Sequence, residues 1–263
     1  SDYFNPLLYT GNGGTQSIDD LTFAPDLVWI KQRTDSGTQN LLQDTVRGIG
    51  SLGGANIIYS DSAETESTNA DSSYFASFNS NGFTVGSNAI YNNSGKDYVA
   101  WNWKAGGAPT ATNSAVAGDV PTAGSVKIDG ADSTTALAAN TVGNTIASDV
   151  RASTESGFSI VTYTGNTTAG ATFGHGLDNS PELIFFKRRN ASNNWLALQT
   201  IEGVGGYLDL SLAFSTGNYN TWLNNTNPTD TLVTLNNYSY INGGDMLAYC
   251  FHSVPGYSKV GSY

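Results

Sequence analysis

Apolar and polar residues alternate with a period of two along several short segments of this chain. The clearest segments are residues 27–31 and 183–187, each preceded by a proline and an acidic residue that are typical of a turn. Residues 97–104 form another strong example. Alternation over four to eight residues, rich in β-branched and aromatic side chains, predicts strands. No run of ten or more residues shows apolar positions at helical spacing, so the pattern predicts an all-β fold.

The alternation also predicts which side chains share a face of each strand. In residues 97–104, Val99, Trp101 and Trp103 fall on one face, because successive side chains of a strand point to opposite sides. A related segment later in the chain places Leu247, Tyr249 and Phe251 together in the same way. Both faces are bulky and apolar, and we expect them to form the hydrophobic core.

The same phrases occur twice along the chain. Residues 4–12 read FNPLLYTGN and residues 158–166 read FSIVTYTGN; the other pairs are PDLVWIKQR with PELIFFKRR (25–33 and 181–189) and DYVAWNWK with DMLAYCFH (97–104 and 245–252). Repetition in the same order predicts two related domains in tandem. Many short strands separated by turn residues favour an antiparallel β-sandwich, jelly-roll-like, in each half.

We therefore expect one β-sandwich repeat over residues 1–107 and a second over residues 157–263. Residues 108–156 are rich in Ala, Thr, Gly and Ser, which is typical of a linker. Within this linker arm, residues 125–130 alternate like a short strand and end on a glycine, and residues 136–139 could form one helical turn. We expect the arm to pack along one or both domains.

Composition and charge narrow the function classes. The chain has 263 residues with 11 basic and 22 acidic side chains, a formal charge of −11 that disfavours nucleic acid as a partner. No apolar run approaches the roughly 18 residues that a bilayer-spanning helix needs, so membrane insertion is not expected. The single cysteine, Cys250, cannot form an intrachain disulfide and is expected to be a buried, inert thiol. A start at Ser1 suggests processing or a segment of a longer polypeptide.

Motifs for catalysis or cofactor binding are weak. Residues 48–53 (GIGSLG) match a dinucleotide-binding pattern, but the required βαβ context is missing, and a glycine turn with positive φ is the better interpretation. His175 and His252 lie far apart, without acids or cysteines at metal-ligand spacing, so structural or surface roles are expected for them. The acidic residues at 61, 64, 66 and 71 could hold calcium, although a solvated loop is the simpler interpretation. We expect no cofactor, no metal and no catalytic residues.

Aromatic side chains in polar surroundings suggest sugar binding instead. In the second copy these are Tyr219, Trp222, Tyr238 and Tyr240, and in the first copy Tyr74, Phe75 and Tyr91. Sugars stack on such rings and hydrogen-bond to neighbouring Asn and Ser side chains. Each of these residues could equally be a half-buried strand residue, because sandwich cores consume many aromatics.

The repeated phrases resemble a repeat family in large virion proteins of marine tailed bacteriophages. The resemblance rests on residues 2–5 (DYFN), 8–13 (LYTGNG), 25–31 (PDLVWIK) and 98–107 (YVAWNWKAGG) in the first copy, on residues 126–130 (VKIDG) in the linker, and on residues 157–165, 174–177 and 249–259 in the second copy. It covers nearly the whole chain.

The resemblance implies a non-enzymatic structural protein on the virion surface, in a tail fibre or other appendage, or as a decoration protein on the capsid exterior. Its expected partners are other virion proteins, further copies of itself in a homo-oligomer, and host surface glycans. Two alternatives stay open. One is a carbohydrate-binding module or polysaccharide depolymerase, which needs clustered aromatics or two facing carboxyl groups. The other is a purely self-assembling decoration protein.

Overall fold

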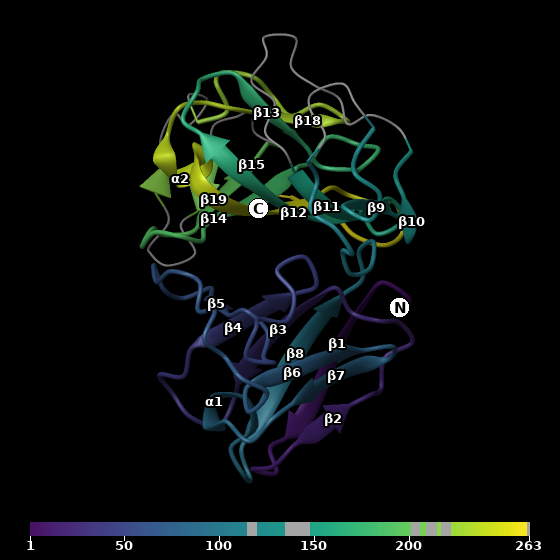
Figure 1. Ribbon diagram of the computed structural model, residues 1–263, viewed down its shortest axis with the longest axis vertical. Coiled ribbons are helices and arrows are strands. Elements are labelled where there is room, and N and C mark those ends of the chain that lie inside the picture. Colours follow the sequence, from purple (N-terminus) through teal and green to yellow (C-terminus); the bar gives the residue numbers. More distant parts are fainter. Residues whose placement is uncertain (115–119, 135–147, 201–205, 209–214, 217–221, 262–263) are drawn as a thin grey trace.

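The chain folds into two β-sandwiches that lie end to end along the long axis of the molecule (Figure 1). The computed structural model describes residues 1–114, 120–134, 148–200, 206–208, 215–216 and 222–261. The purple-to-blue first repeat and the green-to-yellow second repeat each place a large sheet against the other, so the two large sheets are the inner layers of the molecule (Figure 1). The predicted all-β fold, with mainly antiparallel sheets and an internal duplication, is confirmed.

The first repeat has a five-stranded sheet in the order β1-β8-β3-β4-β5 and a three-stranded sheet in the order β2-β7-β6. A single helical turn, α1, precedes β8. The bounds are β1 Phe4–Thr10, β2 Gln16–Ile18, β3 Leu27–Gln32, β4 Asn40–Asp44, β5 Ile58–Tyr59, β6 Phe75–Asn79, β7 Gly82–Val85, α1 Ala89–Asn92 and β8 Asp97–Trp103.

The second repeat repeats this plan. In its nine-stranded sheet, β12-β19-β14-β15 follow one another as β1-β8-β3-β4 do in the first repeat, and β13 pairs with β18 in the opposing sheet. The bounds are β9 Val126–Ile128, β10 Ala131–Asp132, β11 Ser148–Ser153, β12 Phe158–Asn166, β13 Ala171–Gly174, β14 Leu183–Arg188, β15 Leu196–Gln199, β16 Gly206–Leu208, β17 Ser215–Thr216, β18 Leu232–Leu235, α2 Ser239–Asn242 and β19 Gly243–Phe251.

The most regular sequence patterns correspond to observed strands. The segments predicted at 27–31 and 183–187 are β3 and β14, and the segments at 97–104 and 245–252 coincide closely with β8 and β19. The glycine-rich phrase at 48–53 is a turn in which Gly48 and Gly53 have φ of 66° and 89°, as the sequence predicts. Residues 136–139, where a helical turn is expected, lie outside the described residues.

The segment expected to be a linker arm adds strands to the second repeat. Its short predicted strand is β9, which pairs in parallel with β11, and β11 pairs antiparallel with β12. These strands cover the outer edge of β12. The equivalent strand of the first repeat, β1, has no such neighbour among the described residues and ends its sheet.

The outer edge of β1 has its own protection. Backbone bonds from Lys104 to Tyr3 and from Gly11 to Lys96 set the register with β8, so the backbone groups of the even-numbered residues point outward. At these positions Ser1 Oγ bonds both the N–H and the carbonyl of Phe4, and Pro6 has no N–H to offer. Proline on the outward side of an edge strand is a common protection against strand addition.

Each repeat has its own core between its two sheets. Tyr9 in the first repeat and Tyr163 in the second repeat are buried there, and their hydroxyls donate to the carbonyls of Tyr91 and Ile241. The helical turns end on Asn92 and Asn242, which are fully buried. The side chain of each asparagine hydrogen-bonds the chain that follows β1 or β12, which fixes the turn to the sandwich.

A third apolar core joins the two repeats. Its buried members from the first repeat are Leu27, Leu42, Ile58 and Ala105, and those from the second repeat are Phe158, Ile160, Trp195, Leu247 and Tyr249. Trp103 and Phe251, at equivalent ends of β8 and β19, are half-buried against this core. The inner faces of the two large sheets therefore pack on each other through equivalent strands.

This contact corrects the expectation for the bulky strand faces. In β8 the face buried in the repeat's own core is that of Tyr98, Ala100 and Asn102, whereas Val99, Trp101 and Trp103 are only half-buried on the opposite face. In the second repeat, Leu247 and Tyr249 lie in the core between repeats, while Met246, Ala248 and Cys250 lie in the core of the repeat itself. Both faces of β19 are thus buried, each by a different partner.

Candidate functional site

Three aromatic side chains meet on the surface of the second repeat, beside α2. The ring of Trp222 stacks on the ring of Tyr238 with centroids 5.0 Å apart and planes 30° apart. Tyr240 meets the same indole edge to face, at 5.9 Å and 80°. Tyr238 and Tyr240 remain 40% and 41% exposed, so their rings contact solvent as well as Trp222. We refer to Trp222, Tyr238 and Tyr240 as the aromatic cluster.

The backbone beneath the aromatic cluster is fixed by buried groups. The Asn236 N–H donates to the Trp222 carbonyl at 2.9 Å, and the Asn242 side chain donates to the Asn236 carbonyl at 2.8 Å. Leu223 and Ile241, each adjacent to a cluster residue, are fully buried in the core of the second repeat. The exposed rings therefore stand on a support that is already ordered.

The turn that carries Trp222 continues into two asparagines with an uncommon backbone. Asn224 and Asn225 have φ of 52° and 54°, in the left-handed region that non-glycine residues seldom occupy. Asparagine is the side chain that tolerates this region best. Asn225 is exposed and Asn224 is half-buried, so amide groups lie next to the rings along the chain.

The structure brings together some of the residues that the sequence analysis selected for glycan stacking and separates others. Three of the four predicted residues, Trp222, Tyr238 and Tyr240, lie together, and Tyr219 lies outside the described residues. The candidates in the first repeat do not form a matching surface. Phe75 and Tyr91 are fully buried core residues, and Tyr74 is half-buried against the same core.

The aromatic cluster has no counterpart in the first repeat. The bond from Gly86 N–H to the Tyr74 carbonyl matches the bond from Asn236 to Trp222, and it places Tyr74 at the position of Trp222. By the same alignment of α1 with α2, Asn88 and Ile90 stand where Tyr238 and Tyr240 stand. The two exposed tyrosines are therefore specific to the second repeat.

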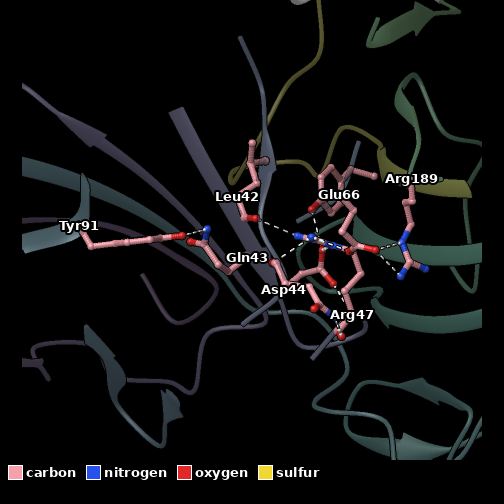
Figure 2. Close-up of polar contacts among 9 residues, drawn as sticks. Leu42, Gln43, Asp44, Arg47, Glu66, Tyr91 and Arg189 are labelled. Atoms are coloured by element: carbon pink, nitrogen blue, oxygen red, sulfur yellow. Dashed lines mark hydrogen bonds and ion pairs between the residues drawn. The ribbon is translucent and has the colours of Figure 1, made fainter. Parts of the chain in front are cut away.

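A second group of polar side chains links the two repeats (Figure 2). Arg47 pairs through Nε with Asp44 at 2.6 Å and through an Nη with Glu66 at 3.1 Å. Glu66 in turn pairs with Arg189 of the second repeat at 2.7 Å, and the hydroxyl of Tyr249 donates to Asp44 at 2.7 Å. We call these five residues the charge cluster.

The charge cluster is buried and electrostatically coupled. Burial alone would lower the pKa of Arg47, but Asp44, Tyr249 and Glu66 outweigh it and raise that pKa. Burial, and then the Asp44 carboxylate, raises the pKa of the Tyr249 hydroxyl well above its usual value. The charge cluster therefore contains charged Arg47 and neutral Tyr249, and it links the repeats through the Glu66–Arg189 and Asp44–Tyr249 contacts.

The charge cluster corrects the interpretation of the acidic loop. Glu66 is only 6% exposed and paired with two arginines, so it is not part of a solvated loop. No group of metal-ligating side chains occurs among the described residues. The pairing of Glu66 with Arg47 and Arg189 was not visible in the sequence, because these partners are separated widely along the chain.

A polar pocket of about 200 Å³ opens on the second repeat. It is lined by Asp149 and Asp245 together with Arg189, Thr112, Asn113, Thr162, Tyr163 and Thr164. Burial raises the pKa of the Asp149 carboxyl, although the bond from the Asn113 N–H opposes this shift. Two carboxyl groups in one pocket are what the depolymerase alternative requires.

The isolated histidine and cysteine have structural surroundings. His175 is fully buried; its Nδ1 accepts from the Leu177 N–H, so Nε2 carries the proton and donates to the Thr229 carbonyl at 3.1 Å. Burial lowers the pKa of His175 to about 4, which keeps the ring neutral. Cys250 is buried, and burial raises the pKa of its thiol to about 12, as expected for an inert residue. No helix in the described part of the chain has the length and apolar character to cross a membrane.

The fold and the two clusters define an all-β tandem-repeat protein whose repeats are locked together and whose second copy alone carries a surface aromatic cluster. The chain belongs to the family described as "Domain of unknown function (DUF7483)", which matches it twice, over residues 1–135 and 129–263. The two matches overlap in residues 129–135, which include β10. No curated protein and no solved structure matches the chain.

Proposed function

We propose that this chain is a non-enzymatic structural module of a tailed-bacteriophage virion. It is displayed on the particle surface, in a tail fibre or other appendage or as a decoration of the capsid exterior. There it contacts neighbouring virion proteins, further copies of itself and the host surface. The phrases that resemble repeats of marine phage virion proteins support this assignment of place.

The observation that carries the structural role is the fused pair of repeats. An apolar core and a buried charge cluster join the two sandwiches, so a load applied to one repeat passes to the other through packed side chains. Tandem domains that share only a small polar interface move relative to each other by default. Two repeats joined through packed side chains suit an appendage that must hold a surface at a fixed orientation.

The acidic balance fits this role. A charge of −11 keeps a protein soluble and discourages association with the packaged nucleic acid. These properties are needed by a module on the outside of a particle.

The test is immunogold electron microscopy on purified particles, with antibody raised against the whole chain. Labelling at the tail or on the capsid exterior is the expected result. Particles that carry no chain, by labelling and by mass spectrometry of their proteins, would contradict the proposal. Labelling that requires disrupted particles would contradict the surface location.

A second candidate function, carbohydrate binding, is favoured by the aromatic cluster. A depolymerase is its enzymatic form, with Asp149 and Asp245 as the carboxyl groups that share a pocket. Release of reducing ends from polysaccharide by the wild-type chain, abolished by Asp149→Asn, would establish the enzyme. Full activity in that variant would rule out Asp149 as a catalytic group, and no release by the wild-type chain would leave the non-enzymatic module.

A further inference from the structure

The aromatic cluster has features that a purely structural role does not explain. Packing alone does not require Tyr238 and Tyr240, because the first repeat builds the same turn with Asn88 and Ile90. Two tyrosines that are 40% and 41% exposed add apolar surface in contact with water. Exposed aromatic groups that converge on one spot are typical of binding surfaces.

The geometry of the aromatic cluster suits a flat, partly apolar ligand. Trp222 and Tyr238 lie nearly parallel, at 30°, while Tyr240 stands almost perpendicular to the indole at 80°. The rings of the two tyrosines are therefore inclined to each other. A ring-shaped ligand with one C–H face can stack on one tyrosine and contact the edge of the other.

Charged residues are rare in the segment of sequence that carries the aromatic cluster. From residue 222 to residue 242 the sequence contains no Lys or Arg and a single acid, Asp230. The hydrogen-bonding side chains next to the cluster residues along the chain are amides and a hydroxyl, from Asn224, Asn225, Asn237 and Ser239. Amides can both donate to and accept from sugar hydroxyls. This segment of the chain therefore offers a carboxylated or sulfated ligand no basic side chain to pair with.

The backbone beneath the aromatic cluster is already ordered before any ligand binds. The support beneath the rings is held by the Asn236 and Asn242 bonds and by buried Leu223 and Ile241. A ligand that binds here does not have to order the backbone, which reduces the entropic cost of a weak contact. The left-handed pair Asn224 and Asn225 is the kind of strained backbone that is retained where a site needs a particular shape.

From these observations we propose that Trp222, Tyr238 and Tyr240 form a binding site for neutral pyranose sugars, such as glucose or galactose units of a surface polysaccharide. The proposal rests on the attachment role stated above and names its ligand class. The sugar stacks its C–H face on an exposed tyrosine, and the neighbouring asparagine amides bind its hydroxyls. The first repeat, which lacks both tyrosines, does not bind.

The test uses the full chain. An array of neutral and anionic oligosaccharides is followed by titration calorimetry with methyl β-glucoside, methyl β-galactoside, glucuronic acid and N-acetylneuraminic acid. We expect a neutral pyranoside to bind with a dissociation constant of about 1 mM, since a monosaccharide offers few contact atoms. Saturation-transfer NMR should mark the C–H protons of one sugar face most strongly.

The key variant is Tyr238→Asn combined with Tyr240→Ile, because the first repeat already folds with these residues. Its matched control is Tyr257→Asn, which removes a tyrosine that is 36% exposed elsewhere on the second repeat. The double variant should bind at least tenfold more weakly with an unchanged melting temperature, and the control should bind within twofold of wild type.

Three results would overturn the proposal: no neutral sugar bound by a folded chain, binding that survives in the double variant, or binding of the anionic sugars alone. These outcomes are separable from the proposed virion role. Particles labelled by antibody, together with a chain that binds no sugar, would leave the structural module intact and remove the glycan site.

Discussion

Removal of one oxygen atom at the junction between the repeats should weaken the whole molecule. In Tyr249→Phe the ring stays in the core that joins the repeats, and only the hydroxyl that donates to Asp44 is lost. The Asp44 carboxylate keeps its bond to Arg47 at 2.6 Å but loses a partner in a buried position. A hydrogen bond to a charged group contributes about 1.5–3 kcal/mol, so we expect the free energy of unfolding to fall by that amount.

The measurement is urea unfolding together with differential scanning calorimetry. For a chain of this size, each kcal/mol lowers the melting temperature by about 2–4 °C, which predicts a decrease of roughly 3–12 °C. The matched control is Tyr163→Phe, which removes a buried hydroxyl that donates to the Ile241 carbonyl within the second repeat. It should also destabilise the chain, but independently of Asp44.

A double-mutant cycle separates the two cases. In an Asp44→Asn background, the cost of Tyr249→Phe should shrink by at least about 1 kcal/mol, whereas the cost of Tyr163→Phe should stay constant, because distant sites add. A loss below about 0.5 kcal/mol for Tyr249→Phe, or equal costs in both backgrounds, would refute the view that this contact locks the repeats together.

Three further perturbations test other parts of the structure. Arg47→Met should cost about 3–5 kcal/mol in denaturant unfolding, because Asp44 and Glu66 are left buried without their shared cation; an effect below 1 kcal/mol would contradict the charge cluster. Asn242→Ala should cost about 3 kcal/mol in the same assay, since the buried amide bonds the Thr168 and Asn236 carbonyls, and full stability would show that water replaces it. The pKa of His175 is about 4 in the fold against 6.5 when unfolded, so the stability that its neutral ring contributes is complete above pH 6.5. This contribution falls by about 3 kcal/mol as the pH drops through 4. His175→Gln should flatten this part of the plot of stability against pH, and an unchanged slope would contradict the prediction.

The sequence predicted the strands well where local pattern decides them. Residues 27–31 and 183–187 begin after a proline and an acid and alternate cleanly, and β3 and β14 begin at the expected residues. The order of the duplicated phrases also predicted two similar sandwiches. These features depend on neighbours along the chain, which a sequence displays directly.

The faces of the strands were harder to predict, because burial depends on a partner that the pattern does not name. The alternation in β8 predicted that Trp101 and Trp103 lie in the core of the first repeat. Instead, the small Ala100 lies in that core, and Trp103 packs against the core between the repeats. In β19 both faces are apolar, so a period of two cannot tell one core from two. Only the fold shows that the duplicated sheets cover each other.

The candidate site divides in a similar way. Aromatic residues among asparagines pointed to Trp222, Tyr238 and Tyr240, and these three rings do meet. The same reasoning also selected Phe75 and Tyr91, which are buried, because composition does not reveal depth. The link between the repeats in the charge cluster had no local signal, since Glu66 and Arg189 are brought together only by the packing of one repeat on the other.

The outer edges of the equivalent strands β1 and β12 differ in how they are protected. Strand β12 pairs with β11 along its outer edge. At the equivalent edge of β1, the Ser1 hydroxyl bonds the outward N–H and carbonyl of Phe4. Pro6 has no N–H to donate. When copies of this chain are crowded side by side, β1 is therefore a poor template for a sheet that continues from one molecule to the next. At this strand, crowding and fibre formation are kept apart, although both depend on the same backbone groups.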